Sequence, residues 1–322
     1  MWHDTSFYRF NGYSDFEDFI LDVPRRFNFP SEVFSFGETV EGRKMYCLRL
    51  GKRQDEKPGV LYMSLVHGVE FIGGETNLAV MEWFSDIGNS EKAERILADC
   101  NVYIVPVINP DAYELAVREK KKYGLTFARK NARGVDLNRN FSVEFGKRGA
   151  GLWGGLPLKF MPVYRGPHAF SEPEVRCIRS FILGHPIKTS LSFHSSGRVI
   201  GFPYCHTGER CPDYQMLKDV AHGMRRRQKG RKYDVMQEFD YVPTSGDMDD
   251  WLYEEGGVLP FLIEIGRFGF LSESIERWFN PFAWVNMPDP DKEIGRILPG
   301  VIYLAEWTAE NFGTHRTGEN SP

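Results

Sequence analysis

The sequence predicts an α/β fold with a mixed, mostly parallel twisted sheet and helices on both faces. Apolar runs of strand length occupy 60–66, 102–108 and 258–265, and segments with helical spacing lie between them. Continuous apolar strands are typical of a sheet buried on both faces, and their alternation with helices is typical of α/β architecture. The 322 residues, 42% of them hydrophobic, are enough for a large core.

The first half of the predicted sheet consists of two strands with a helix between them. The strand 60–66 is followed by 75–86, where apolar residues repeat every three or four positions. The strand 102–108 ends at the turn signal Asn109-Pro110-Asp111.

The second half begins with a helix that we expect to start at Ser171. Its hydroxyl can cap the helix while Glu174 completes a capping box. The strands 191–194 and 258–265 follow, and the Gly-rich segment 141–167 is expected to be a long surface loop.

Composition and charge limit the partners. The net charge of -4 does not favour a global attraction to nucleic acid or to an anionic membrane. No apolar run approaches the ~20 residues that span a bilayer, and the N-terminus lacks the basic-then-apolar order of a signal peptide. We therefore expect a cytoplasmic protein without nucleic-acid or membrane partners; a processed secreted form is the alternative, and the oligomeric state stays open.

The chain is expected to form a single domain. Without an internal repeat or a dividing linker, 1–313 is expected to form one domain and 314–322 a flexible tail.

The odd number of cysteines favours free thiols in a reducing compartment. Only Cys205 and Cys211 are close enough in sequence to invite a disulfide, and two free thiols are the favoured interpretation.

Three segments far apart in the sequence contain the residues of a metal-dependent hydrolase site. His67 and Glu70 directly follow the first predicted strand, His194 ends a later one, and Glu264 lies in the last apolar run. Two imidazoles and a carboxylate can hold a catalytic zinc while leaving a position for water, and a separate carboxylate can take the proton of that water. An open α/β sheet places its site at such strand ends.

Each of these residues also has a structural interpretation. His67 and Glu70 can be exposed surface residues, and His194 can be a hydrogen-bonded core histidine. Glu264 can form a buried ion pair with an arginine, although an ionisable side chain in an apolar strand favours a functional role.

A second group of residues can bind an anion. Arg129, Asn138 and Arg139 lie within one short stretch. A guanidinium binds a carboxylate through two hydrogen bonds and an amide adds a neutral donor, which suits a free C-terminus. The alternative is that the arginines are solvated loop residues.

These segments, taken in order, resemble the zinc metallocarboxypeptidases of the M14 type, which are the pancreatic carboxypeptidases and their bacterial relatives. The resemblance covers nearly the whole chain and implies a carboxypeptidase-like fold, one Zn²⁺ per chain and a catalytic domain without a prodomain. The segments that carry it are 36–43, His67-x-x-Glu70, 109–111, 134–141, 164–167 with 169–174, 193–195, and 244–251 through Glu264.

The resemblance implies a role for each matching residue. Zinc lowers the pKa of its bound water, and Glu264 acts as the general base and later as the acid. Arg129 polarises the scissile carbonyl. The implied zinc ligands are His67, Glu70 and His194, and the residues implied to hold the terminal carboxylate are Asn138 and Arg139.

Three features depart from the family or refine it. The phenolic clamp of the family falls on Val242, and a one-residue extension around Pro243 would bring Tyr241 to the site instead. Ser196-Gly197 replaces an aromatic residue and is expected to leave room beside the penultimate side chain. Asp249 lies at the expected floor of the pocket for the terminal side chain, where a carboxylate favours a cation; the alternative is an acid that stabilises a helix start.

The predicted function is a zinc-dependent metallocarboxypeptidase that hydrolyses the C-terminal amide bond of a peptide, with a preference for a basic terminal residue. The alternative is an amidase that releases diaminopimelate from peptidoglycan peptides, or an N-acyl amino acid deacylase with the same chemistry. A binding module without catalysis is a third interpretation, which the complete set of ligands and Glu264 disfavours.

Overall fold

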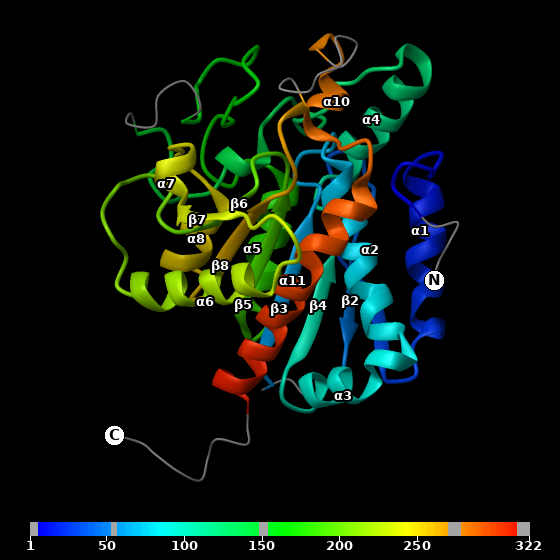
Figure 1. The fold of residues 1–322 in the computed structure, drawn as a ribbon. Coiled ribbons are helices and arrows are strands. Elements are labelled where there is room, and N and C mark those ends of the chain that lie inside the picture. The colour runs from blue at the N-terminus through cyan, green and yellow to red at the C-terminus, as the bar shows by residue number, and fades with distance from the viewer. Residues whose placement is uncertain (1–5, 53–56, 148–153, 270–277, 314–322) are drawn as a thin grey trace.

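A computed structural model describes residues 6–52, 57–147, 154–269 and 278–313 (Figure 1). The expected tail at 314–322 lies outside these residues. In the described part of 141–167 the regular pairing is one isolated bridge between Leu156 and Tyr164, in agreement with an irregular loop.

The described strands form an eight-stranded sheet with the order β1-β2-β4-β3-β5-β8-β6-β7. The central strands β4, β3, β5 and β8 are parallel to one another, whereas β1 and β2 add antiparallel pairs at one side and β6 pairs antiparallel with β8. This confirms the predicted mixed, mostly parallel sheet. The bounds are β1 (Ser31–Glu38), β2 (Lys44–Leu50), β3 (Gly59–Ser64), β4 (Asn101–Val105), β5 (Ile187–His194), β6 (Val199–Phe202), β7 (Asp234–Gln237) and β8 (Leu259–Glu264).

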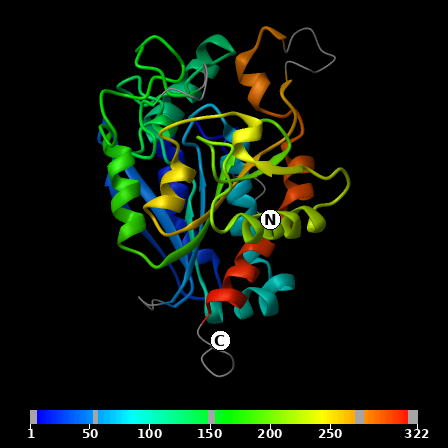
Figure 2. The same cartoon turned by 90° about the vertical axis from the view of Figure 1, so that its left-hand side faces the viewer.

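Helices cover both faces of the sheet, and each face has its own hydrophobic core. Figure 2 shows α5 on one side of the sheet and α11 on the other. Alternate residues of a strand point to opposite faces, so Tyr62 packs in the core under α2 and α11 while Leu61 and Met63 pack under α5 and α8. The described α-helices are α1 (Tyr13–Asp22), α2 (Phe71–Ser85), α3 (Ser90–Asp99), α4 (Pro110–Tyr123), α5 (Pro173–Leu183), α6 (Tyr214–Arg227), α7 (Glu238–Tyr241), α8 (Met248–Glu254), α10 (Pro281–Val285) and α11 (Pro290–Phe312). Among the described helices, none combines the length and the apolar character needed to cross a membrane.

The start of α2 differs from the prediction. The helix begins at Phe71, four residues before the expected start at 75. Gly73 and Gly74 have a low helix propensity. A Cβ added to Gly73 would lie 2.9 Å from the carbonyl oxygen of Phe193, and one added to Gly74 would lie 2.6 Å from the ring of Phe7. Close packing against β5 and the N-terminal segment therefore requires these glycines and outweighs their low propensity.

The predicted cap of the helix after residue 171 is wrong. The helix α5 begins at Pro173, and the residue before it is Glu172, which makes no side-chain cap. The hydroxyl of Ser171 instead donates to the carboxylate of Glu172 over 2.7 Å and accepts from Nδ2 of Asn140 over 2.8 Å. Ser171 thus connects α5 to the loop that follows α4.

The sheet topology brings the candidate residues together. Because β3, β5 and β8 are adjacent and parallel, their carboxyl ends lie at one edge of the sheet. His194 and Glu264 are direct partners in the β5–β8 register, and His67 and Glu70 follow β3. A site at this edge was predicted, and the strand order explains it.

Candidate active site

The loop between β3 and α2 presents His67 and Glu70. The amide of Glu70 donates to the carbonyl of His67 over 3.1 Å and closes a tight turn. Gly68 lies so close to α4 that an added Cβ would be 2.3 Å from the carbonyl carbon of Ala112. This contact requires glycine, and it holds the turn at the end of β3.

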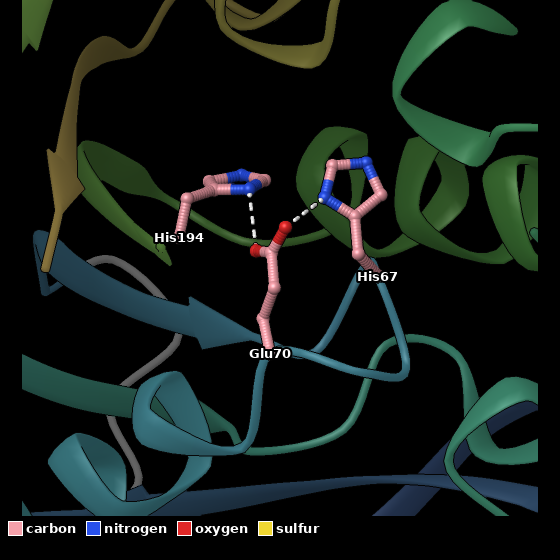
Figure 3. Close-up of side chains that lie close together, drawn as sticks. All are labelled: His67, Glu70 and His194. Atoms are coloured by element: carbon pink, nitrogen blue, oxygen red, sulfur yellow. Dashed lines mark hydrogen bonds and ion pairs between the residues drawn. The ribbon is translucent and has the colours of Figure 1, made fainter. Parts of the chain in front are cut away.

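The carboxylate of Glu70 lies between the imidazoles of His67 and His194 (Figure 3). Nδ1 of His67 is 2.9 Å from Oε1, and Nδ1 of His194 is 3.1 Å from Oε2. All three side chains are buried, and one ligand atom from each lies within 4.8 Å of the others. The predicted ligand residues are therefore brought together in space.

Charge in this group is shared between the carboxylate and the imidazoles. Burial opposes ionisation of Glu70, but the neighbouring His67 and His194 hold the pKa of Glu70 well below its ordinary value. Burial likewise opposes a charge on His194, yet the hydrogen bond with Glu70 raises the pKa of His194 to about 9. A cation bound between these groups would replace the protons that they share.

Asp136 orients His67 from the other side. Its Oδ1 is 3.2 Å from Nε2 of His67, and its Oδ2 accepts from Nε of Arg129 over 2.9 Å. Burial opposes its ionisation, but Arg129 and His67 hold the pKa of Asp136 well below its ordinary value. No role was predicted for Asp136, and the available signal in the sequence was an acid between the apolar Val135 and Leu137.

Glu264 ends β8 beside the three residues. Its Oε2 is buried and has no hydrogen-bond partner among the described residues, and an ion pair with an arginine is absent there as well. Burial raises the pKa of Glu264 to about 7, while His194 acts in the opposite direction. The structural interpretation of Glu264 as half of a buried ion pair is therefore wrong.

Arg129 lies between Asp136 and the candidate metal ligands. Its Nη1 is 3.9 Å from Oε1 of Glu70, and Nη2 is 2.9 Å from Oδ2 of Asp136. Asp136 fixes the guanidinium, and the side chain of Arg129 as a whole keeps 23% of its surface exposed. This is the property needed for a group that contacts a substrate carbonyl.

Tyr241, at the end of α7, reaches the same region. Its hydroxyl donates to the carbonyl of Ser196 over 2.9 Å, and a Cβ added to Gly197 would lie 2.4 Å from that hydroxyl oxygen. Burial, with Glu264 and Glu70 nearby, raises the pKa of Tyr241. The space expected beside Ser196-Gly197 is thus partly filled by the protein's own tyrosine, which corrects that expectation.

Asn138 and Arg139 come from a short turn after Asp136 and are both buried. Their side chains do not face open solvent but contact Asp247. Nδ2 of Asn138 donates to Oδ2 of Asp247 over 3.0 Å, and Nη1 of Arg139 is 3.3 Å from the same oxygen. The alternative of solvated loop arginines is therefore wrong for Arg139.

Asp249 lies in the first turn of α8 and is fully buried. Its Oδ2 accepts from the hydroxyl of Ser192 over 3.2 Å, and its Oδ1 has no partner among the described residues. Ser192 and His194 point to the same face of β5 because they are two residues apart. Asp249 therefore lies on the face of the sheet that carries the candidate metal ligands.

Glu238 is a second buried acid in this region, for which no role was predicted. Its Oε2 accepts from Sγ of Cys205 over 2.8 Å, and its Oε1 has no partner among the described residues. A Cβ added to Gly201 would lie 2.5 Å from Cγ of Glu238, so glycine in β6 makes room for this side chain. Nothing in the local sequence distinguishes Glu238 from an exposed helical glutamate.

The buried group Cys205, Glu238 and Asp247 also has the spacing of a metal site. Both oxygens of Asp247 are already used, however, Oδ1 by the amide of Asp249 and Oδ2 by Asn138 and Arg139. The thiol proton of Cys205 is directed at Glu238. The thiol of Cys205 and the carboxylate of Asp247 are therefore already engaged in hydrogen bonds, whereas Oε1 of Glu238 lacks a partner within the described part of the chain. The five cysteines, Cys205 and Cys211 included, are all free thiols.

Comparison with known families agrees with this geometry. The zinc carboxypeptidase family model matches residues 17–280, which is most of the chain. The chain belongs to the zinc carboxypeptidase family. Its metallopeptidase chemistry and its use of zinc follow from this membership, and the cluster of His67, Glu70 and His194 fits the zinc site by its donor atoms and burial.

Two relatives of this zinc carboxypeptidase illustrate the breadth of the family. Carboxypeptidase B of Astacus astacus is 31% identical over 255 residues, which cover 75% of this chain and 82% of the relative. Human carboxypeptidase A6 is 31% identical over 262 residues, covering 74% of this chain but 56% of its own length. The chain thus spans little more than half of that relative.

The carboxypeptidase A of Helicoverpa armigera has a similar fold. Its crystal structure has a TM-score of 0.77 with 24% identity and covers 95% of this chain and 75% of that chain. At this identity the likeness concerns the fold, and it confirms the carboxypeptidase-like architecture.

Replacement of Asp136 by Asn is expected to weaken zinc binding about 10- to 100-fold, because the orientation and basicity of His67 depend on this carboxylate. The measurement is the zinc dissociation constant from competition with a chromophoric chelator. Asp111→Asn is the matched control, since Asp111 is also buried and paired with an arginine, Arg43, but contacts neither histidine. Equal zinc affinity in Asp136→Asn and wild type would contradict the orienting role.

Proposed function

We propose that this zinc carboxypeptidase releases a basic residue from the C-terminus of peptides. The observation that supports this preference is the pair of buried acids Asp249 and Glu238, each with one carboxylate oxygen that lacks a hydrogen-bond partner among the described residues. The curated relatives include carboxypeptidases of both the A and B types, so the family alone does not fix the preference.

The proposed chemistry assigns one task to each residue beside the metal ligands. When bound by His67, Glu70 and His194, zinc supplies a water of lowered pKa and a Lewis acid. Glu264 takes the proton of the attacking water at its carboxylate and later gives it to the leaving amine. Arg129 donates hydrogen bonds to the carbonyl oxygen as negative charge develops on it. Tyr241, whose hydroxyl is held at Ser196, lies where it can cover the bound peptide.

The electrostatics of the pocket support a cationic leaving residue. Burial, together with Asp247, raises the pKa of Asp249 well above its ordinary value. Burial and the nearby Asp249 do the same for Glu238. Neither acid forms an ion pair with a lysine or arginine of the described chain. An ammonium or guanidinium group between them would supply the missing donors and favour the ionised carboxylates.

The same acids disfavour the alternative of diaminopimelate release. The murein-tripeptide amidase of Escherichia coli shares the fold with a TM-score of 0.51 at 19% identity, a likeness that concerns the fold alone. Diaminopimelate carries a carboxylate beside its distal amine, and that carboxylate would meet Asp249 and Glu238 in a buried pocket. A substrate carboxylate there would further disfavour the ionised form of these acids, which burial already disfavours, so a simple basic side chain is the better fit.

Replacement of Asp249 by Asn is expected to lower kcat/KM on lysine- and arginine-terminated peptides, because a desolvated ion pair with the substrate is lost. The corresponding loss of transition-state stabilisation should be about 3 kcal/mol or more. Leucine- and phenylalanine-terminated peptides should change far less. The measurement is kcat/KM on a series of N-blocked dipeptides that differ in the last residue.

The matched control is Asp250→Asn, which alters the neighbouring acid. Asp250 accepts from the amides of Cys205 and His206 and serves the loop rather than the pocket. It should affect basic and apolar substrates equally. If Asp249→Asn also affects both classes equally, Asp249 has only a structural role and the proposed preference is wrong.

A further inference from the structure

Asn138 and Arg139, which the family resemblance implies hold the terminal carboxylate, are already in contact with a carboxylate of this chain. We name Asn138 and Arg139 the carboxylate grip. Both donate toward Oδ2 of Asp247, Asn138 over 3.0 Å and Arg139 over 3.3 Å. Asp247 itself is 3% exposed. An internal side chain therefore presents the functional group that a substrate would present.

Asp247 is held at this place by its own loop. Its Oδ1 accepts from the amide of Asp249 over 2.9 Å and caps α8, while the hydroxyl of Thr244 is 3.3 Å from Oδ2. Gly246 precedes it with φ +66°, and an added Cβ there would lie 2.6 Å from the carbonyl oxygen of Arg139. The amide of Phe141 donates to the carbonyl of Gly246 over 3.0 Å. The segment before α8 is thus bonded to the segment that carries the grip.

This contact changes what the grip can bind. A guanidinium that is paired with a buried carboxylate is largely neutralised, and a second carboxylate brought beside the first is repelled. A free terminal carboxylate that approaches Asn138 and Arg139 must therefore either lie beside the carboxylate of Asp247 or displace it.

We propose that Asp247 is a built-in ligand of the carboxylate grip and a specificity-determining residue that weakens the binding of a free terminal carboxylate. The inference rests on the proposed function, because it assumes that the leaving residue binds beside Asn138 and Arg139. It follows that the affinity for a leaving amino acid exceeds the affinity for the corresponding amine by less than it would if Asp247 did not contact Asn138 and Arg139. Removal of the Asp247 carboxylate restores that distinction.

The test compares amino acids with their decarboxylated amines. Lysine and 1,5-diaminopentane form one pair, and leucine and isopentylamine form a second pair that does not depend on a basic preference. Their dissociation constants are measured by isothermal titration calorimetry on zinc-loaded wild type, Asp247→Ser and Asp247→Asn. Serine can still cap α8 but is too short to reach the grip, and asparagine removes the charge with little change of shape.

The decisive quantity is the ratio of the amine and amino-acid dissociation constants. We expect this ratio to rise at least about tenfold from wild type to Asp247→Ser in both pairs, with a smaller rise in Asp247→Asn, as for removal of a buried like charge. Asp86→Ser is the control for loss of an aspartate cap, because Asp86 accepts from the amide of Gly88 at the far end of α2. Its ratio should equal that of wild type.

An unchanged or lower ratio in both Asp247 variants, with wild-type circular dichroism, overturns the inference. Failure of the proposed function gives a different result. In that case zinc-loaded wild type releases no C-terminal residue from any peptide, or releases it equally well with a chelator present, whatever the binding ratios are.

Discussion

Glu264→Gln is expected to keep its zinc and to lose kcat by about a thousandfold or more, on the scale of removing a general base from a water-activating site. The carboxylate ends β8 beside His194 and is not one of the three clustered ligand residues. Its Oε2 has no hydrogen-bond partner among the described residues, so an amide of the same shape should fit without a large change in folding free energy. Metal content and single-turnover rates measured on the same preparation separate binding from chemistry.

The pH dependence provides a second readout for the same residue. Burial raises the pKa of Glu264 to about 7 in the metal-free chain. A bound dication favours the ionised carboxylate, so the working pKa lies below that value. A base acts in its deprotonated form, and kcat/KM should therefore fall as the pH drops through this pKa. The assignment would be contradicted if Glu264→Gln contained no metal. It would also be contradicted if Glu264→Gln kept the wild-type fall of kcat/KM at acidic pH.

His194→Ala is expected to abolish stoichiometric zinc binding, with an affinity loss greater than the roughly 100-fold typical of changes in residues that only orient a ligand. His194 contributes one of the two imidazoles against Glu70, and its ring has no substitute within the described residues of the cluster. Wild type should bind one zinc per chain. The measurement is zinc content by atomic emission after dialysis against buffered metal.

Thermal unfolding supplies an independent check on His194→Ala. Ligand binding to the native state raises its stability, by about 2.7 kcal/mol at a free zinc concentration 100 times the dissociation constant. Addition of a chelator should therefore lower the Tm of wild type but leave the Tm of His194→Ala unchanged. His222→Ala on α6 is the matched control and should behave like wild type. A chelator response in His194→Ala equal to that of wild type would remove His194 from the ligand set.

The sequence by itself determined the fold class and the metal-binding residues. Apolar strands and intervening helical periodicity are local signals, and they are sufficient because a sheet that is covered on both faces needs continuous apolar strands. The candidate site residues were found because each follows, ends or lies within such a strand, where an ionisable side chain is unusual. These residues are His67, Glu70, His194 and Glu264. The helix starts at Phe71 and Pro173 were misplaced, since glycine packing and loop contacts decided them.

Only the tertiary structure decided how the buried acids near the candidate active site are used. In sequence, Asp136, Glu238 and Asp247 look like ordinary loop or helix-start acids. In the fold, Asp136 contacts His67, Glu238 packs against Gly201, and Asp247 lies against Asn138 and Arg139. The role of a carboxylate depends on which donors surround it and on how deeply it is buried, and contacts between residues about 30 to 110 positions apart decide both. Periodicity and motifs indicate the fold class and the metal-binding residues. Strand order and packing determine which groups surround each carboxylate.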